Sequence, residues 1–253
     1  MRARWCLRAA GLTGLFVLVA CSRAPDTSKE DAQLAAAYHT SSTGNVASLE
    51  SKVLATSHGR VRRLDDTLIL ILSGGKNLTL RNDTPDCSGD IGHLDRLCGS
   101  FLMLADLPNH HFYLVCLIED ESVDYLLIDD RTGHETLVDA VPIFSADGTH
   151  FLVQNDDEMN DHDNNLEIWR RENDGAVLEW AHSVMQASAE APSSLLYHTD
   201  VTSWRDNRIN LTFSLGKNFD SERKRIVPAQ HWAGTITREN GKWQLQANWP
   251  KSK

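Results

Sequence analysis

The sequence predicts a mostly β protein built from antiparallel hairpins, with short helices near its N-terminus. Two observations carry this prediction. Short apolar or alternating segments recur from residue 61 onward, and Asp-Gly or Asn-Gly pairs, which supply the positive φ angles of tight hairpin turns, separate several of them. The chain of 253 residues is long enough to bury a substantial core in one or two domains.

The N-terminal segment has the pattern of an export signal. Arg2, Arg4 and Arg8 form a cationic region, and residues 9–20 form an uncharged apolar stretch. That stretch has the length of a signal-peptide core and is too short to span a bilayer, which needs about 20 apolar residues. It ends in the motif Leu18-Val19-Ala20-Cys21.

This motif resembles the lipobox of bacterial lipoproteins. The resemblance implies that residues 1–20 are removed as a lipoprotein signal peptide and that Cys21 is acylated on its thiol and on its new amine. The protein would then be held on a membrane through a covalent lipid anchor. In the sorting rule of this family an Asp after the cysteine favours the inner membrane, so Ser22 favours the outer membrane, facing the periplasm, in a source that has one. The alternative is a conventional secreted protein with a chance cysteine near its cleavage site.

Residues 21–58 are predicted to be a lipid-anchored tether with short helices, and residues 59–253 a β-rich domain. Within the tether, Ser28-Lys29-Glu30-Asp31 has the form of a capping box and precedes the helix formers of residues 33–37. A second helix is predicted from Val46 to Ala55. Isolated helices of this length are marginal in water, so both should persist only if they dock.

Strand patterns dominate after Gly59. We predict strands at residues 61–64, 67–72, 78–80, 101–104, 112–118, 125–128, 141–144, 151–153, 166–169 and 177–180. Turn signals occur at Asp129-Asp130-Arg131-Thr132-Gly133, Ala146-Asp147-Gly148, Glu172-Asn173-Asp174-Gly175, Arg205-Asp206-Asn207 and Glu239-Asn240-Gly241. The spacing of these turns predicts a series of hairpins.

Two stretches of the chain echo each other. Phe144-Ser145-Ala146-Asp147-Gly148 opens the first unit and Ser203-Trp204-Arg205-Asp206-Asn207 opens the second, which lacks the Gly. Later in each unit, Arg171-Glu172-Asn173-Asp174-Gly175 and Arg238-Glu239-Asn240-Gly241 each lie between a strand and a tryptophan-bearing strand. The first unit, with its strand Leu166-Glu167-Ile168-Trp169, resembles the Phe-Ser-Pro-Asp-Gly hairpin and Leu-x-Ile-Trp strand of β-propeller blades in exported bacterial proteins, with Ala146 in place of the Pro. The resemblance covers residues 113–180 and implies a β-propeller-like array. Because the spacing of the units exceeds the roughly 40–50 residues of common propeller repeats, the array should be irregular or incomplete. A β-sandwich of hairpins is the alternative.

The cysteines fit an oxidising compartment. Cys87 and Cys98 bracket a short polar loop, and a disulfide closing such a loop removes about 3 kcal/mol of unfolded-state entropy in the chain-entropy model. Cys116 instead lies within an apolar run, where a buried thiol behaves as a small hydrophobe. We predict that Cys87 pairs with Cys98 and that Cys116 is free.

The most acidic segment of the chain covers residues 155–165. Asp161, Asp163 and Asn165 occupy alternate positions and offer the oxygen ligands that Ca²⁺ prefers. Leu166 stands where an EF-hand requires Gly, so a looser calcium loop is the metal-binding alternative. The favoured interpretation is a solvent-exposed loop between strands, whose charges protect a sheet edge from pairing with another chain. No other cofactor is predicted.

The composition limits the classes of partner. A net charge of −10 argues against nucleic acid, because neutralising phosphates requires clustered Lys and Arg. The sequence contains no Gly-x-Ser-x-Gly elbow and no His-Glu-x-x-His motif, so no catalytic residue is predicted. A lipid-anchored binding or scaffold module with an envelope protein as partner is the first hypothesis. The alternative is an envelope hydrolase that uses scattered carboxylates such as Asp156, Asp157 and Asp161.

Overall fold

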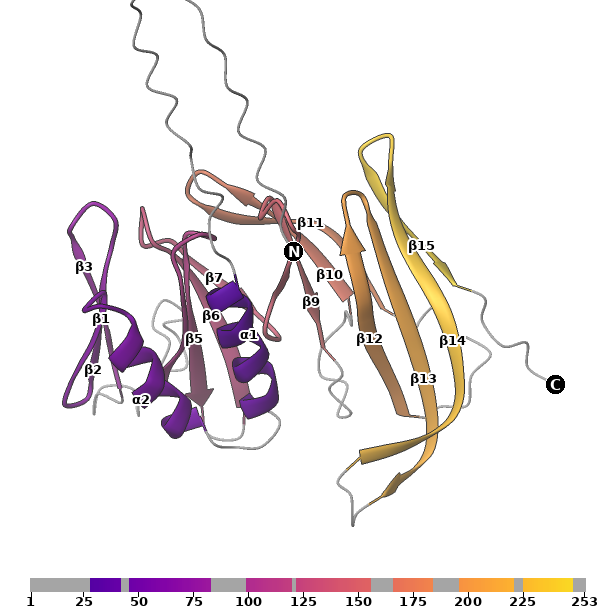
Figure 1. The fold of residues 1–253 in the computed structure, drawn as a ribbon, viewed down its shortest axis with the longest axis horizontal. Coiled ribbons are helices and arrows are strands. Elements are labelled where there is room, and N and C mark those ends of the chain that lie inside the picture. Colours follow the sequence, from indigo (N-terminus) through magenta and orange to yellow (C-terminus); the bar gives the residue numbers. More distant parts are fainter. Residues whose placement is uncertain are drawn as a thin grey trace, which may run out of the picture.

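The protein is mostly β, as the sequence predicts. The structure is a computed structural model that describes residues 28–41, 46–82, 99–119, 122–155, 166–183, 196–220 and 225–247. In these ranges two helices precede four antiparallel sheets, and none of the sheets closes on itself. The sheets follow one another in chain order along the long axis of the view, from indigo to yellow in Figure 1.

Each sheet is a meander in which consecutive strands pair, and we number the sheets 1 to 4 in chain order. Sheet 1 contains β1 (Val61–Leu64), β2 (Thr67–Ile71) and β3 (Asn77–Arg81). Sheet 2 contains β4 (Ser100–Leu107), β5 (Phe112–Glu119), β6 (Ser122–Asp129) and β7 (Glu135–Val138). Sheet 3 contains β8 (Ile143–Phe144), β9 (His150–Gln154), β10 (Leu166–Glu172) and β11 (Gly175–His182). Sheet 4 contains β12 (Leu196–Arg205), β13 (Arg208–Asp220), β14 (Arg225–Glu239) and β15 (Lys242–Ala247).

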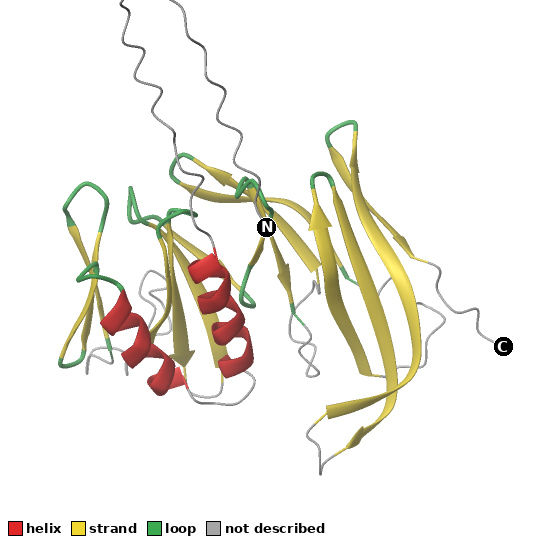
Figure 2. Ribbon diagram, viewed as in Figure 1, coloured by secondary structure: helices red, strands yellow, loops and turns green. Residues whose placement is uncertain are grey.

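The two helices dock against sheet 2. Helices α1 (Ser28–Ser41) and α2 (Val46–Thr56) both contact β4, and Figure 2 shows them in red beside that sheet. Their apolar sides bury Ala37 and Val53. Both predicted helices are therefore confirmed, and their docking supplies the burial that helices of this length need in water.

Sheet 3 lies between two hydrophobic cores. Along β9, Phe151 and Val153 belong to the core shared with sheets 1 and 2, whereas Leu152 belongs to the core shared with sheet 4. Successive side chains of a strand point to opposite faces, so a strand with no polar face must be covered on both sides. This explains why the centre of β9, Phe151 to Val153, is continuously apolar and why the sheets stack in layers.

The far face of sheet 4 is polar. Along β13, Ile209 and Leu211 are buried against sheet 3, while the alternating residues Asn210 and Thr212 lie on the opposite face. On β15, Gln244 is exposed in the same alternating pattern. A polar outer face is what the terminal unit of a stacked array requires in order to remain soluble.

The strands of sheet 4 lie beyond the predicted ranges, which end at residue 180, and two earlier strands also differ from the expectation. Strand β7 was not predicted, because its sequence places the polar Glu135 and Thr136 before two apolar residues and shows no alternation. The strand predicted at 141–144 is reduced to the two residues of β8, since Pro142 has no N–H group for a ladder. The echoed turns, in contrast, occupy corresponding places, between the first two and the last two strands of sheets 3 and 4.

Candidate functional site

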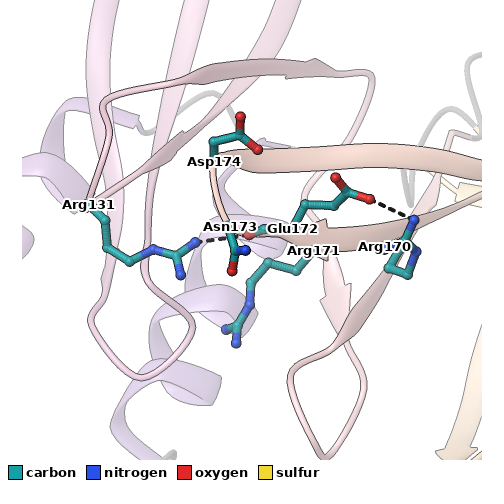
Figure 3. A pocket seen from close by; sticks show the side chains of 6 residues that line it. All are labelled: Arg131, Arg170, Arg171, Glu172, Asn173 and Asp174. Carbon is teal, nitrogen blue, oxygen red and sulfur yellow. Dashed lines mark hydrogen bonds and ion pairs between the residues drawn. The ribbon is translucent and has the colours of Figure 1, made fainter.

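An open pocket of about 650 Å³ lies where the β10–β11 hairpin meets the turn after β6 (Figure 3). Its lining residues are Arg131, Arg170, Arg171, Glu172, Asn173 and Asp174. We call it the arginine pocket. The hairpin fits closely against sheet 2 because residue 175 is glycine: its φ of 141° disfavours other residues, and a β carbon there would collide with the ring of His134. The pocket is thus built from two sheets.

Arg131 is fixed in the pocket by a fully buried carboxylate. Asp129, at the end of β6, accepts the backbone N–H groups of Arg131 and Thr132 at 2.9 and 3.0 Å and pairs with Arg131 Nη2 at 2.6 Å. Burial acts to raise the pKa of Asp129, but the hydrogen bonds from Arg131 outweigh it and hold that pKa below its ordinary value. Arg131 Nη2 also donates to the Glu172 carbonyl at 3.0 Å, which joins sheet 2 to sheet 3.

Arg171 enters the pocket from β10 and is held loosely. Its Nη1 donates to the carbonyl oxygen of His110 at 3.1 Å. Within the part of the chain that the structure describes, no carboxylate forms a hydrogen bond or ion pair with its guanidinium. Burial lowers the pKa of Arg171, and the charge of nearby Arg131 lowers it further. Two guanidinium groups therefore face the same pocket and repel each other.

The other charged residues of the pocket, Arg170, Glu172 and Asp174, do not neutralise Arg171. Arg170 is neutralised, because it pairs with Glu172 at 2.6 Å and with Glu179 at 2.7 Å. Figure 3 shows the Asp174 carboxylate on the side of the hairpin opposite the Arg171 guanidinium. The side of the pocket that Arg131 and Arg171 share is therefore cationic.

A second charged cluster lies beneath α1 and is closed to solvent. Glu30, Asp106 and His110 are 3%, 6% and 6% exposed. Glu30 Oε1 accepts the N–H of Asn109 at 2.8 Å, and Asp106 pairs with Arg60 at 3.2 Å. Burial raises the pKa of Glu30 and of Asp106 and lowers that of His110. Perturbed carboxylates suggest catalysis only where a substrate can reach them, so we interpret this cluster as the polar attachment of α1 to the β4–β5 turn.

Glu30→Gln should raise the free energy of unfolding by about 1 kcal/mol at pH 7. Glu30 Oε2 and His110 Nε2 lie 3.8 Å apart, and neither has a hydrogen-bond partner among the described residues. The amide removes a buried charge, retains the acceptor for Asn109 and adds a donor toward His110. The folded-state pKa of Glu30 is raised, so the protonated carboxyl stabilises the fold relative to the ionised one. This stabilisation is complete below the ordinary pKa of 4.5 and is lost as pH rises through the folded-state value.

Urea unfolding at pH 7.5 and pH 4 measures this effect. The advantage of Glu30→Gln should shrink at the lower pH, where the wild-type carboxyl is itself protonated. Glu30→Ala, which removes the acceptor for Asn109, should be destabilised at both pH values. A Glu30→Gln protein as unstable at pH 7.5 as Glu30→Ala would contradict the interpretation.

A third cluster joins sheets 3 and 4. Glu179 on β11 accepts Trp243 Nε1 at 3.0 Å and Arg238 Nη2 at 3.1 Å, both from sheet 4. His150 Nε2 lies 3.3 Å from the same carboxylate. The Arg238 guanidinium also lies over the Trp243 ring, 5.5 Å from its centroid. These contacts form a polar network beside the hydrophobic core that sheet 3 shares with sheet 4, which we call the second core.

Most residues singled out from the sequence lie outside the described ranges. This applies to the leader and Cys21, to Ser22, to Cys87 and Cys98, to the calcium candidates Asp161, Asp163 and Asn165, and to the hydrolase candidates Asp156 and Asp157. The structure describes Cys116, which is a free thiol, 1% exposed. Burial raises the pKa of Cys116 to about 11, so the thiol is inert near neutral pH.

Sequence reasoning did not identify the arginine pocket. Arg171 belongs to the strand that leads into a predicted turn, and Arg131 lies inside another predicted turn, so each residue had a local explanation. The doubled Arg170-Arg171 beside an Asn-Asp-Gly turn is a weak signal that could have been noticed. Nothing in the sequence pairs it with a turn forty residues earlier.

Comparison of the chain with protein-family models gives no match, and a search of curated proteins gives none either. In the described ranges, no helix is long and apolar enough to cross a membrane. Among the same residues, no group of three His, Cys, Asp or Glu side chains is placed to hold a metal ion.

Proposed function

We propose that the protein is a lipid-anchored binding module of the cell envelope. The observation that carries this proposal is the Leu18-Val19-Ala20-Cys21 motif behind a cationic and apolar leader. Cys21 would carry the lipid, and Ser22 favours the outer membrane with the domain facing the periplasm. The first element that the structure describes, α1, begins at Ser28, seven residues after Cys21, so an anchored protein would be held close to the bilayer.

We further propose that the four sheets form an incomplete β-propeller-like array. Four consecutive meanders stacked in chain order support it, as does the correspondence of the echoed turns in sheets 3 and 4. The polar far face of sheet 4 favours an open array over a ring that closes on sheet 1. Such an array presents hairpins and turns along its rims, and the arginine pocket lies among them as the binding surface that we propose.

Cys21→Ser should abolish acylation and release the protein from membranes or leave it unprocessed. The reason is that the thiol is the only atom of this side chain that can carry the diacylglyceryl group. The measurement is metabolic labelling with an alkyne palmitate, followed by fractionation of a bacterial host that processes lipoproteins.

Cys6→Ser is the matched control, because it makes the same exchange within the leader that processing would remove. It should be labelled and membrane-bound like the wild type. A Cys21→Ser protein that stays acylated and membrane-bound would refute the proposed anchor.

A further inference from the structure

The guanidinium groups of Arg131 and Arg171 in the arginine pocket have N–H donors that form no hydrogen bond with the described residues. An arginine carries five N–H groups. Arg131 uses Nε and Nη2 on Asp129 and on the Glu172 carbonyl, and Arg171 uses Nη1 on the His110 carbonyl. In the described part of the chain, Arg131 Nη1 and the Nε and Nη2 of Arg171 have no hydrogen-bond partner.

Among the described residues, no carboxylate accepts a hydrogen bond from these free donors. Both oxygens of Asp129, at the end of β6, are already held by Arg131 and by backbone or hydroxyl groups of the following turn. Glu172 directs its side chain to Arg170. Two partly buried cations consequently remain side by side. The charges of Asp129, Asp147 and Asp130 offset part of their repulsion, and an anion between the two guanidinium groups would offset more of it.

We propose that the arginine pocket binds a phosphate group, either free or as the monoester of a small sugar, between Arg131 and Arg171. This inference deepens the proposed binding function and rests on it for the identity of the binding surface. A phosphate presents oxygens in several directions and carries up to two charges, so it can accept from two guanidinium groups that approach from different sheets. A carboxylate, with two coplanar oxygens, matches a single guanidinium fork.

The size of the pocket also suits a larger ligand than phosphate alone. Its volume of about 650 Å³ falls within the range of small-molecule sites, which is roughly 300–1,000 Å³. The hairpin rim offers further polar groups, among them the exposed Asn173, to the hydroxyl groups of a sugar. Phosphate bound to Arg131 and Arg171 would thus leave space for a sugar ring.

Isothermal titration calorimetry of the purified full-length mature protein in detergent, at constant ionic strength, tests the proposal. The probes are inorganic phosphate, glucose 1-phosphate and acetate. Inorganic phosphate and glucose 1-phosphate should each bind one per chain, and acetate should bind at least about tenfold more weakly than either. Tighter binding of glucose 1-phosphate assigns the pocket to a sugar monoester, and equal binding assigns it to the phosphate group alone.

Three variants locate the site. Arg171→Gln should weaken binding by about tenfold or more, because it removes at least one charge-assisted hydrogen bond. Arg171→Lys keeps the charge and most of the packing but loses the planar fork, so it should bind more weakly while unfolding at the wild-type urea concentration. Asp174→Asn, which removes a carboxylate from the rim, should strengthen binding. Arg62→Gln is the control with the same change of charge, on exposed β1, and should bind within twofold of the wild type.

The inference is overturned if neither phosphate compound binds, if acetate binds as well as phosphate, or if Arg171→Gln or Arg171→Lys binds phosphate as tightly as the Arg62→Gln control. All of these results are independent of whether the Cys21→Ser protein is labelled with palmitate and released from the membrane. Failure of the phosphate site and failure of the lipid-anchor proposal can therefore be told apart.

Discussion

Phe151→Ala should lower the free energy of unfolding by about 3–5 kcal/mol. Phe151 is fully buried on β9 and stacks parallel to Trp169 with ring centroids 6.1 Å apart. Its ring centroid also lies 5.5 Å from that of Phe144 and 6.3 Å from that of Phe112 in sheet 2. Truncation would leave a cavity between sheets 2 and 3 that rigid neighbouring strands cannot fill. Since domains are stable by only about 5–15 kcal/mol, the variant should be close to unfolding at 37 °C.

Urea unfolding followed by circular dichroism and by tryptophan fluorescence measures the loss. Leu137→Ala, on β7 with 47% of Leu137 exposed, is the control and should change stability by less than about 1 kcal/mol. Because β9 gives Phe151 to one core and Leu152 to the other, both signals should shift together. A loss no larger than that of Leu137→Ala, or two separate transitions of which one shifts, would contradict the layered arrangement.

The parts of the fold that the sequence predicts are those with a local physical cause. The continuous apolar run of β5 indicates a strand covered on both faces, and all of its residues from Phe112 to Leu117 are at most 1% exposed. The Asn240-Gly241 turn has the positive φ values, 51° and 77°, that its residue types predict. Strand β7 has no such signal, because this edge strand of four residues buries the polar Thr136 and exposes the apolar Leu137.

The charged clusters could not be predicted for a different reason. Arg131 and Arg171 come together because sheets 2 and 3 stack. That stacking depends on the burial of both faces of β9 and on the close fit of Gly175 against His134, which no local sequence pattern reveals. Likewise, Glu30 reaches the β4–β5 turn only because α1 docks on sheet 2. His110 and His111 are adjacent and would face opposite sides of a strand. They lie instead in that turn, where His110 approaches Glu30 and His111 Nδ1 lies 3.2 Å from Asp130.

Glu179→Ala should lower the free energy of unfolding by about 2–3 kcal/mol at pH 7. The carboxylate, 15% exposed, is the common acceptor for Arg170 of its own sheet and for Arg238 and Trp243 of sheet 4. Removing it leaves the Trp243 indole N–H and a half-buried guanidinium without their acceptor. The packing of sheet 4 on sheet 3 should weaken, although no apolar contact of the second core is changed.

The pH dependence of the Glu179→Gln variant separates this network from simple packing. Burial acts to raise the pKa of Glu179, but the hydrogen bonds from Trp243 and Arg170 outweigh it and lower that pKa. A carboxyl with a depressed folded-state pKa stabilises the fold above its ordinary value of 4.5, and this stabilisation is lost as pH falls through the folded-state value. Burial lowers the pKa of His150, so protonation of that residue below about 6.5 favours the unfolded chain and reduces stability in the same direction.

Urea unfolding at pH 7 and pH 4 should therefore show a smaller difference in stability between wild type and Glu179→Gln at the lower pH, where the stabilisation by the carboxylate has begun to fall. Glu172→Gln is the matched control. The Glu172 side chain is 36% exposed and, among the described residues, forms an ion pair only with Arg170, so its loss should cost less than about 0.5 kcal/mol at either pH. If Glu179→Gln loses no more stability than Glu172→Gln at pH 7, the contacts between sheets 3 and 4 depend on apolar packing and the shared carboxylate is incidental. If the difference persists undiminished at pH 4, the charge of Glu179 is not the cause.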